Sequence, residues 1–216
     1  MRKSTPRRAK LLRRPNLLAG EDFAPMPSQR RSRMRRDALL RAALELFARD
    51  GFEAAAIGAI AERAGVAVGG FYQHFRSKRQ LLIVLMNELL QKLEAIDMQP
   101  SGDSVRGAIE SVLRAGLATD LAYAGAYRAW REAMLSDREL AALDAKIRRW
   151  TTARLRAVFM QILALPNAWR DIDGALFAAL MDRLFWDLLG SRLVSRPDTI
   201  ETLAHIIEHS LLKASA

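Results

Sequence analysis

Hydrophobic positions recur at helical spacing from about residue 34 onward. The first clear stripe runs through Leu39, Leu40, Ala43, Leu44, Leu46 and Phe47. Such i, i+3, i+4, i+7 spacing is typical of a helix with one buried face. Gly51 follows, and glycine commonly ends a helix in the left-handed conformation. We therefore predict a helix over about residues 35–49 that stops before Gly51.

Two much shorter helical pieces come next, over about residues 57–64 and 68–74, with Gly65 between them. Two short helices joined by a turn that contains glycine predict a helix-turn-helix unit. Isolated helices shorter than about 12–15 residues are marginal in water, so these pieces need a third helix beneath them. The helix over residues 35–49 supplies that support.

The rest of the chain also reads as helix. A long helix is expected from Lys78 to about residue 96, with further helices over about 103–119, 121–135, 137–164, 171–189 and 197–213. No strand-like alternation or internal repeat is present. The sequence predicts an all-α fold, with a largely disordered arm over residues 1–33, a helix-turn-helix domain over 34–93 and a helical domain over 94–216.

The stretch GVAVGGFYQHFRSK, residues 65–78, differs from an ordinary core helix. Small residues at 67, 69 and 70 leave one face without bulk, which lets the backbone approach another surface closely. We expect Phe71 and Phe75 to point inward and Tyr72 and His74 to point outward as hydrogen-bond donors.

The start of the following helix adds a possible anion site. Ser77 is expected to cap this helix, and Lys78 lies in its first turn, where backbone amides attract anions. Donors and a cation around a smooth helix suit a phosphate backbone. Alternatively, Tyr72 and His74 are ordinary surface residues.

The net charge of +10 is concentrated at the N-terminus. Residues 1–36 hold twelve basic side chains against Glu21 and Asp22, whereas the remainder carries 22 basic and 22 acidic groups. A neutral body with a basic arm suits a polyanionic partner. Alternatively, the arm is only a solubilising or mis-annotated extension, because Met26 or Met34 could be the true start.

Several classes of protein are disfavoured. The chain has no cysteine and only three scattered histidines, so we expect no metal and no cofactor. No constellation of catalytic side chains is recognisable, so we expect no enzyme. No apolar run is long enough to cross a membrane, and no signal peptide is evident, which predicts a cytoplasmic protein.

The sequence over about residues 34–93 resembles the DNA-binding domain of the tetracycline-repressor (TetR) family of bacterial regulators. The resemblance rests on Gly51-Phe52, Ile60-Ala61, Ala64-Gly65-Val66, Gly69, Tyr72, His74-Phe75, Lys78 and Leu81-Leu82. It implies a homodimer that binds a palindromic double-stranded DNA operator and responds to a small-molecule effector. It also implies phosphate contacts from Tyr72, His74 and Lys78, and base readout by Val68, Gly69, Gly70 and Gln73.

The sequence also departs from the family pattern. Hydroxyl or basic residues common around the first short helix are replaced by Ala54-Ala55-Ala56 and Gly58-Ala59, and the usual serine is Ala67. We hypothesise that the arm, including Arg33 and Arg35, compensates with phosphate or minor-groove contacts.

The C-terminal half supplies candidate dimer and ligand residues. The resemblance implies that the last two helices pair across a two-fold axis, with Leu176, Leu180, Leu184, Ile200, Leu203 and Ile207 at the interface. Aromatic residues and methionines typical of a pocket are Tyr127, Trp130, Met134, Trp150, Phe177, Met181 and Phe185. At helical spacing the same residues also suit a plain hydrophobic core.

The function predicted from the sequence is a transcriptional repressor released by a small molecule of unknown identity. The main alternative is a nucleoid-type protein that binds DNA non-specifically through its basic arm.

Overall fold

The computed structural model describes residues 12–23, 28–96, 105–169, 171–189, 191, 193, 196 and 198–213. Within these ranges the chain is helical, as predicted, and contains no strand. The basic residues at positions 2–10 lie outside the described ranges. No helix in the described parts combines the length and apolar character needed to cross a membrane.

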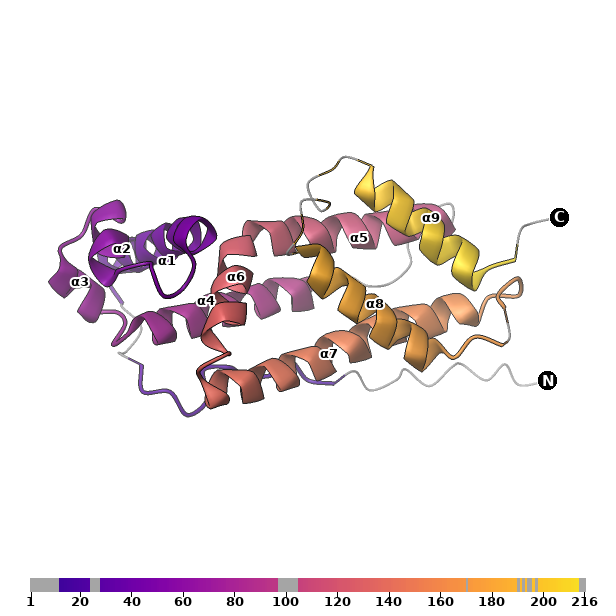
Figure 1. Ribbon diagram of the computed structural model, residues 1–216, viewed down its shortest axis with the longest axis horizontal. Coiled ribbons are helices and arrows are strands. Elements are labelled where there is room, and N and C mark those ends of the chain that lie inside the picture. The colour runs from indigo at the N-terminus through magenta and orange to yellow at the C-terminus, as the bar shows by residue number, and fades with distance from the viewer. Residues whose placement is uncertain are drawn as a thin grey trace.

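Four helices form the N-terminal part of the molecule, which Figure 1 shows at the left. They are α1 (Arg30–Asp50), α2 (Ile57–Arg63), α3 (Val68–Tyr72) and α4 (Lys78–Ala95). We call α1–α3 the head. The long helix α4 leads from the head into the second part, and its side chains from Gln80 to Asn87 are buried.

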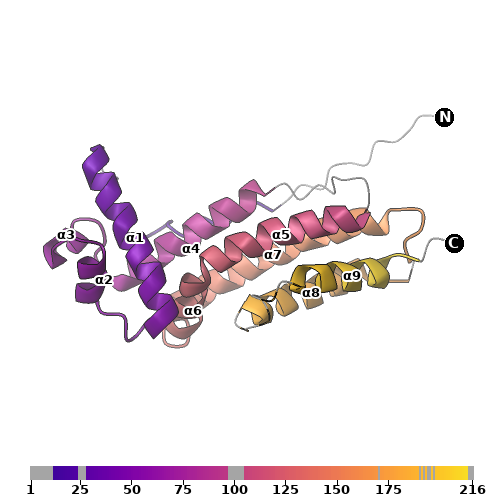
Figure 2. The same cartoon turned by 90° about the horizontal axis from the view of Figure 1, so that it is seen from above.

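Five more helices form the second part, which we call the sensor domain. They are α5 (Val105–Ala122), α6 (Ala124–Ala133), α7 (Arg138–Leu163), α8 (Gly174–Leu189) and α9 (Thr199–Leu211). Helices α5 and α7 run the length of this part, and α8 and α9 lie together on one side of it (Figure 2). The predicted helices all occur, with ends shifted by a few residues.

Two hydrophobic clusters hold the molecule together. One joins the head to α4, α6 and the first half of α7, and it includes Trp130 and Trp150. The other joins α5 and the end of α7 to α8 and α9. The first cluster crosses the predicted boundary near residue 93, so the head is not packed independently of the sensor domain.

Residues 12–23 correct the expectation of a largely disordered arm. Leu17 is only 1% exposed in the first cluster. Arg14 donates to Asn87 Oδ1 at 2.9 Å and to Glu94 Oε2 at 3.0 Å, and Arg79 binds Glu21. The segment is ordered because α4 offers it an apolar site and polar partners together. The segment runs from the head along the sensor domain (Figure 1).

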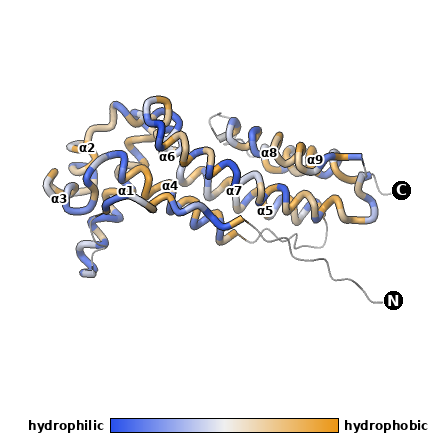
Figure 3. The backbone as a smooth tube through the Cα atoms, turned by 90° about the horizontal axis from the view of Figure 1, so that it is seen from below, coloured by the Kyte–Doolittle hydropathy of each residue, from blue (hydrophilic) through white to orange (hydrophobic). Residues whose placement is uncertain are grey.

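Helix α1 also begins earlier than predicted. It starts at Arg30, four residues before the expected point near Met34. Its first two turns carry Arg33 and Arg35 with exposed side chains. This end of α1 projects from the head and is strongly hydrophilic (Figure 3).

Candidate functional site

Helices α2 and α3 form the helix-turn-helix unit that the sequence predicts. The turn depends on Gly65, whose φ of 68° lies in the left-handed region. The amide of Gly65 donates to Glu62 O and that of Val66 donates to Ala61 O, both at 3.0 Å. These bonds satisfy the last carbonyls of α2, and the positive φ explains why glycine is needed.

The outer face of α3 is nearly free of side chains. Phe71 and Phe75 are buried, as expected, whereas Val68 is 48% and Tyr72 is 54% exposed. A Cβ built on Gly69 would meet no atom of this structure within 4 Å. Glycine in a helix costs about 1 kcal/mol of stability relative to alanine. No contact inside the described chain requires a residue without a side chain at Gly69, so packing does not explain why glycine stands there. The face suits close approach by an external surface.

His74 does not point outward, so that expectation was wrong. Its side chain is only 8% exposed and lies beside Phe75. Burial lowers the pKa of the imidazole, and the charges of Arg36 and Arg35 lower it further. His74 lies outside α3, in the turn that follows Tyr72, where its amide donates to Phe71 O at 2.9 Å. Among these two, only Tyr72 is placed to contact a partner.

Lys78 is partly engaged inside the protein. Its ammonium donates to Phe52 O and, at 3.0 Å, to Glu53 O. Ser77 caps α4, as predicted, by accepting from Gln80 N at 3.2 Å. Lys78 therefore fixes the loop after α1 to the start of α4, and one of its three N–H donors is left for a phosphate.

Helix α6 holds the same loop from the other side. Glu132 accepts from Phe52 N at 2.7 Å and from Glu53 N at 3.0 Å, and these amides lower the pKa of its carboxyl. Arg128 donates to Ala48 O at 2.6 Å. A side chain at Gly125 would clash, because its Cβ would lie 2.0 Å from Leu44 O. Arg128 and Glu132 thus connect the head to α6 rather than anchoring a ligand.

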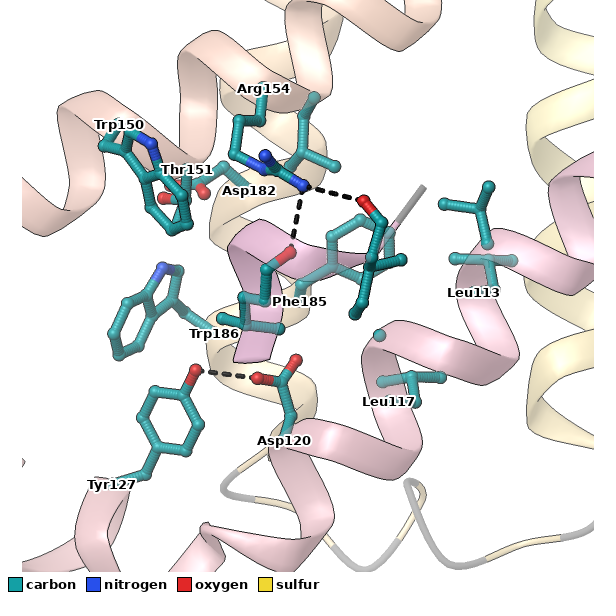
Figure 4. A pocket seen from close by; sticks show the side chains of 15 residues that line it. Leu113, Leu117, Asp120, Tyr127, Trp150, Thr151, Arg154, Asp182, Phe185 and Trp186 are labelled. Atoms are coloured by element: carbon teal, nitrogen blue, oxygen red, sulfur yellow. Dashed lines mark hydrogen bonds between the residues drawn. The ribbon is translucent and has the colours of Figure 1, made fainter. Parts of the chain in front are cut away.

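A cavity of about 130 Å³ lies in the sensor domain. Of the predicted ligand residues, Tyr127, Trp150 and Phe185 line it (Figure 4). The other four belong to the hydrophobic clusters: Trp130 and Met134 to the first, Phe177 and Met181 to the second. Trp130 is fully buried and donates to Asp144 Oδ1 at 3.1 Å, which makes it a core residue.

Polar residues of this cavity were missed by sequence reasoning. Asp120 lies on the wall and accepts from Tyr127 Oη at 2.8 Å. Arg154 donates to Leu93 O at 3.0 Å and to Ile96 O at 3.3 Å (Figure 4). The sequence did contain a signal that Asp120 lies on the buried face of its helix, because it continues the apolar stripe of Leu113, Gly116 and Leu117 at helical spacing.

The predicted dimer residues divide into two groups. On α8, Leu176, Leu180 and Leu184 are 59%, 57% and 38% exposed. On α9, Leu203 and Ile207 are buried, and Ile200 packs against the second cluster. These α9 residues were assigned to the dimer interface from the sequence, but the face of α9 that carries them packs against α5 within the same chain. The exposed leucines of α8 form one stripe, since they recur at i, i+4 and i+8.

Comparison with known proteins agrees with this architecture. A family profile described as bacterial regulatory proteins, tetR family, matches residues 39–85. Residues 39–85 thus match the TetR family. The match agrees with the expectation that the chain is not an enzyme, because the profile describes regulatory proteins.

Curated relatives match over different lengths. The transcriptional regulator TcmR of Streptomyces glaucescens is 34% identical over 90 residues, which cover 41% of this chain and 40% of TcmR. The transcriptional regulator BetI of Rhizobium meliloti (strain 1021) is 29% identical over 189 residues, covering 85% of this chain and 90% of BetI. The chain thus spans about two fifths of the length of TcmR.

Solved structures extend the likeness to the whole fold. The fatty acid degradation regulator FadR of Bacillus halodurans has a TM-score of 0.65 at 16% identity, covering 80% of this chain and 94% of that one. GusR of Salmonella enterica has a TM-score of 0.62 at 20% identity, with coverages of 82% and 95%. At such identities the likeness concerns the fold alone.

Proposed function

We propose that this protein is a transcriptional repressor that binds a palindromic operator as a homodimer and is released by a small molecule. The observation that carries the proposal is the outer face of α3. Nothing in the described chain approaches the missing side chain of Gly69, and the exposed Tyr72 lies beside that face. A helix without bulk enters a major groove closely, and tyrosine beside it donates to phosphate.

Readout of bases would then fall on the exposed Val68 and Gln73, as the sequence suggests. Gln73 is suited to adenine and Val68 to a thymine methyl group. Arg33 and Arg35, exposed near the start of α1, add charge for phosphate contact. His74 is left out of the proposed contact surface because it is buried.

The dimer would form through the leucine stripe of α8. A palindromic site needs two heads about 34–36 Å apart, one helical turn of DNA, and a two-fold axis provides them. The exposed leucines at 176, 180 and 184 are apolar surface that a second copy would cover.

Helix α6 offers a route from ligand to head. Tyr127 lines the cavity, and the next residue, Arg128, binds the end of α1. A ligand that moves Tyr127 would therefore move the head and change the spacing of the two α3 helices. Coupling of about 1–3 kcal/mol is enough to change operator affinity 5- to 150-fold.

The test is a DNA-binding titration on the promoter region beside its own coding sequence, with Gly69→Leu as the decisive variant. Because the space around Gly69 is open, the variant should fold as the parent does. We expect its operator affinity to fall at least about tenfold, the loss of one good contact of about 1.4 kcal/mol. Ala142→Leu, at an exposed site on α7, should bind as the parent does.

Equal binding to operator and to unrelated DNA would contradict the proposal and favour the nucleoid-type alternative. Specific binding should exceed non-specific binding by at least about 10³. Unchanged operator affinity in Gly69→Leu would show that α3 does not enter the groove.

A further inference from the structure

The walls of the sensor cavity carry an imbalance of charge. Asp120 and Asp182 line it together with a single guanidinium, that of Arg154. Arg154 is already engaged, because it donates to the carbonyls of Leu93 and Ile96. These carbonyls belong to the C-terminal end of α4, whose partial negative charge attracts a cation.

Asp120 has no such compensation. It lies in the last turn of α5, where the helix dipole also places partial negative charge. Within the described ranges its carboxylate forms no ion pair with lysine or arginine, and its hydrogen-bond donor is Tyr127 Oη. Burial raises the pKa of Asp120 to about 6, and the Tyr127 hydroxyl only partly opposes that effect.

We propose that this cavity binds an organic cation, an ammonium group carried on an apolar body, with Asp120 as its counter-ion. The ammonium would supply the charge that Asp120 lacks at the negative end of α5. Asp182 adds a second carboxylate, which accepts from Thr151 and Thr152 and lies near Arg148. An anionic ligand would instead face two carboxylates and two helix C-termini.

The remaining lining suits the rest of such a molecule. Leu113, Leu117 and Phe185 offer apolar contacts for the body. Trp150 and Trp186 already attract cations in this protein, since Arg154 lies 5.1 Å from the ring centroid of Trp150 and Arg148 lies 4.5 Å from that of Trp186. Aromatic rings beside a carboxylate are a common setting for ammonium recognition.

The inference deepens the proposed function, since it names the class of effector, but its test needs no DNA. Calorimetric titration of the full chain at pH 7.5 would compare 3-phenylpropylamine, 3-phenylpropanol and 3-phenylpropionate, which share one apolar body. We expect the amine to bind at least tenfold more tightly than the alcohol and the carboxylate to bind most weakly. The preference for the amine should disappear as the pH falls below about 6, because Asp120 then becomes protonated.

The charged and titratable groups around Asp120 come from every neighbouring helix: Glu94 on α4, Tyr127 on α6, Asp144, Arg148 and Arg154 on α7, and Asp182 on α8. Variants therefore assign the effect to Asp120. Asp120→Asn keeps an acceptor for Tyr127 and should abolish the preference for the amine. Asp171→Asn, the same change at an exposed site, should keep it.

Tyr127→Phe provides a second variant that retains the carboxylate. Without the hydroxyl that opposes burial, the pKa of Asp120 should rise, so the preference should weaken at pH 7.5 and recover at higher pH. The inference would be overturned if the amine and the alcohol bound equally, or if the carboxylate bound more tightly than the amine. It would also be overturned if Asp120→Asn kept the preference for the amine, or if the amine did not bind at millimolar concentration. If the amine binds as expected but does not change operator affinity, the inference about the cavity stands, and the proposal that a small molecule releases the repressor is contradicted.

Discussion

Asp120→Asn should stabilise the unliganded protein, by an amount that grows with pH. The pKa of Asp120 is raised from 3.8 to about 6, mainly by burial. A folded-state pKa above the unfolded value means that ionisation opposes folding. The penalty is absent below pH 3.8, grows as the pH rises toward 6 and is complete above it. This rise in pKa corresponds to a penalty of about 3 kcal/mol.

Urea denaturation of the parent and Asp120→Asn at several pH values from 4 to 8 measures this penalty. The difference in unfolding free energy should increase in favour of the variant from pH 4 to about 6 and level off above pH 7. Comparing the two proteins at each pH removes the contributions of other groups, including Asp182, whose pKa is also raised by burial. The exposed control Asp171→Asn should show no such dependence.

A difference that does not vary between pH 4 and 8 would refute the reasoning, because Asp120 would then titrate normally. A variant whose relative stability falls as the pH rises would also refute it, since the carboxylate would then be stabilised by a charge that the structure does not contain. Added 3-phenylpropylamine should stabilise the parent more than the variant, because only the parent has the Asp120 carboxylate to pair with the ammonium.

Three further predictions concern the head and the dimer. Gly125→Ala should lower the unfolding free energy by about 2 kcal/mol, because the added Cβ would lie 2.0 Å from Leu44 O. That figure is an overpacking cost of about 3 kcal/mol reduced by the helix propensity that alanine gains over glycine, about 1 kcal/mol. Stability in urea equal to that of the parent would contradict the tight contact of α6 with α1. Leu180→Lys should give monomers in sedimentation, whereas Leu135→Lys, at a site 84% exposed outside the stripe, should not. Glu132→Gln should reduce thermal stability at pH 7, because the amides of Phe52 and Glu53 lower the pKa of Glu132 in the folded state only. The difference in stability between parent and variant should therefore fade as the pH falls below 4.5. A difference that persists in acid would rule out the charge of Glu132 as its cause.

The helices were predictable because each carries its own local signals. The stripe predicted over 137–164 became α7, Arg138–Leu163, since Asp137 caps it by accepting from Glu139 N and Leu140 N at 2.9 and 3.0 Å. The glycine turn at residue 65 was equally local. Such features depend on neighbours in the chain, so the sequence alone contains them.

The errors arose where the partner is distant in the chain. Trp130 and Trp150 look alike in sequence, yet Trp130 packs in the core against Asp144 whereas Trp150 faces the cavity. Leu17 closely follows Arg13, Arg14 and Pro15, and nothing local indicates that α4 will bury it. Which face of a helix meets a neighbour, and which meets a void, is decided by packing between segments far apart in the sequence.

Helix α6 explains how one short segment can serve both parts of the molecule. Its residue Tyr127 contacts the cavity and holds Asp120, while Arg128 and Glu132 bind the end of α1 and the loop that follows it. The fit against α1 at Gly125 leaves no room for sliding. Under the proposed function, a cation that draws Asp120 away from Tyr127 would act on α6 and, through Arg128 and Glu132, on the end of α1 and the loop after it. The same contacts that hold the head in place would then couple its position to the cavity.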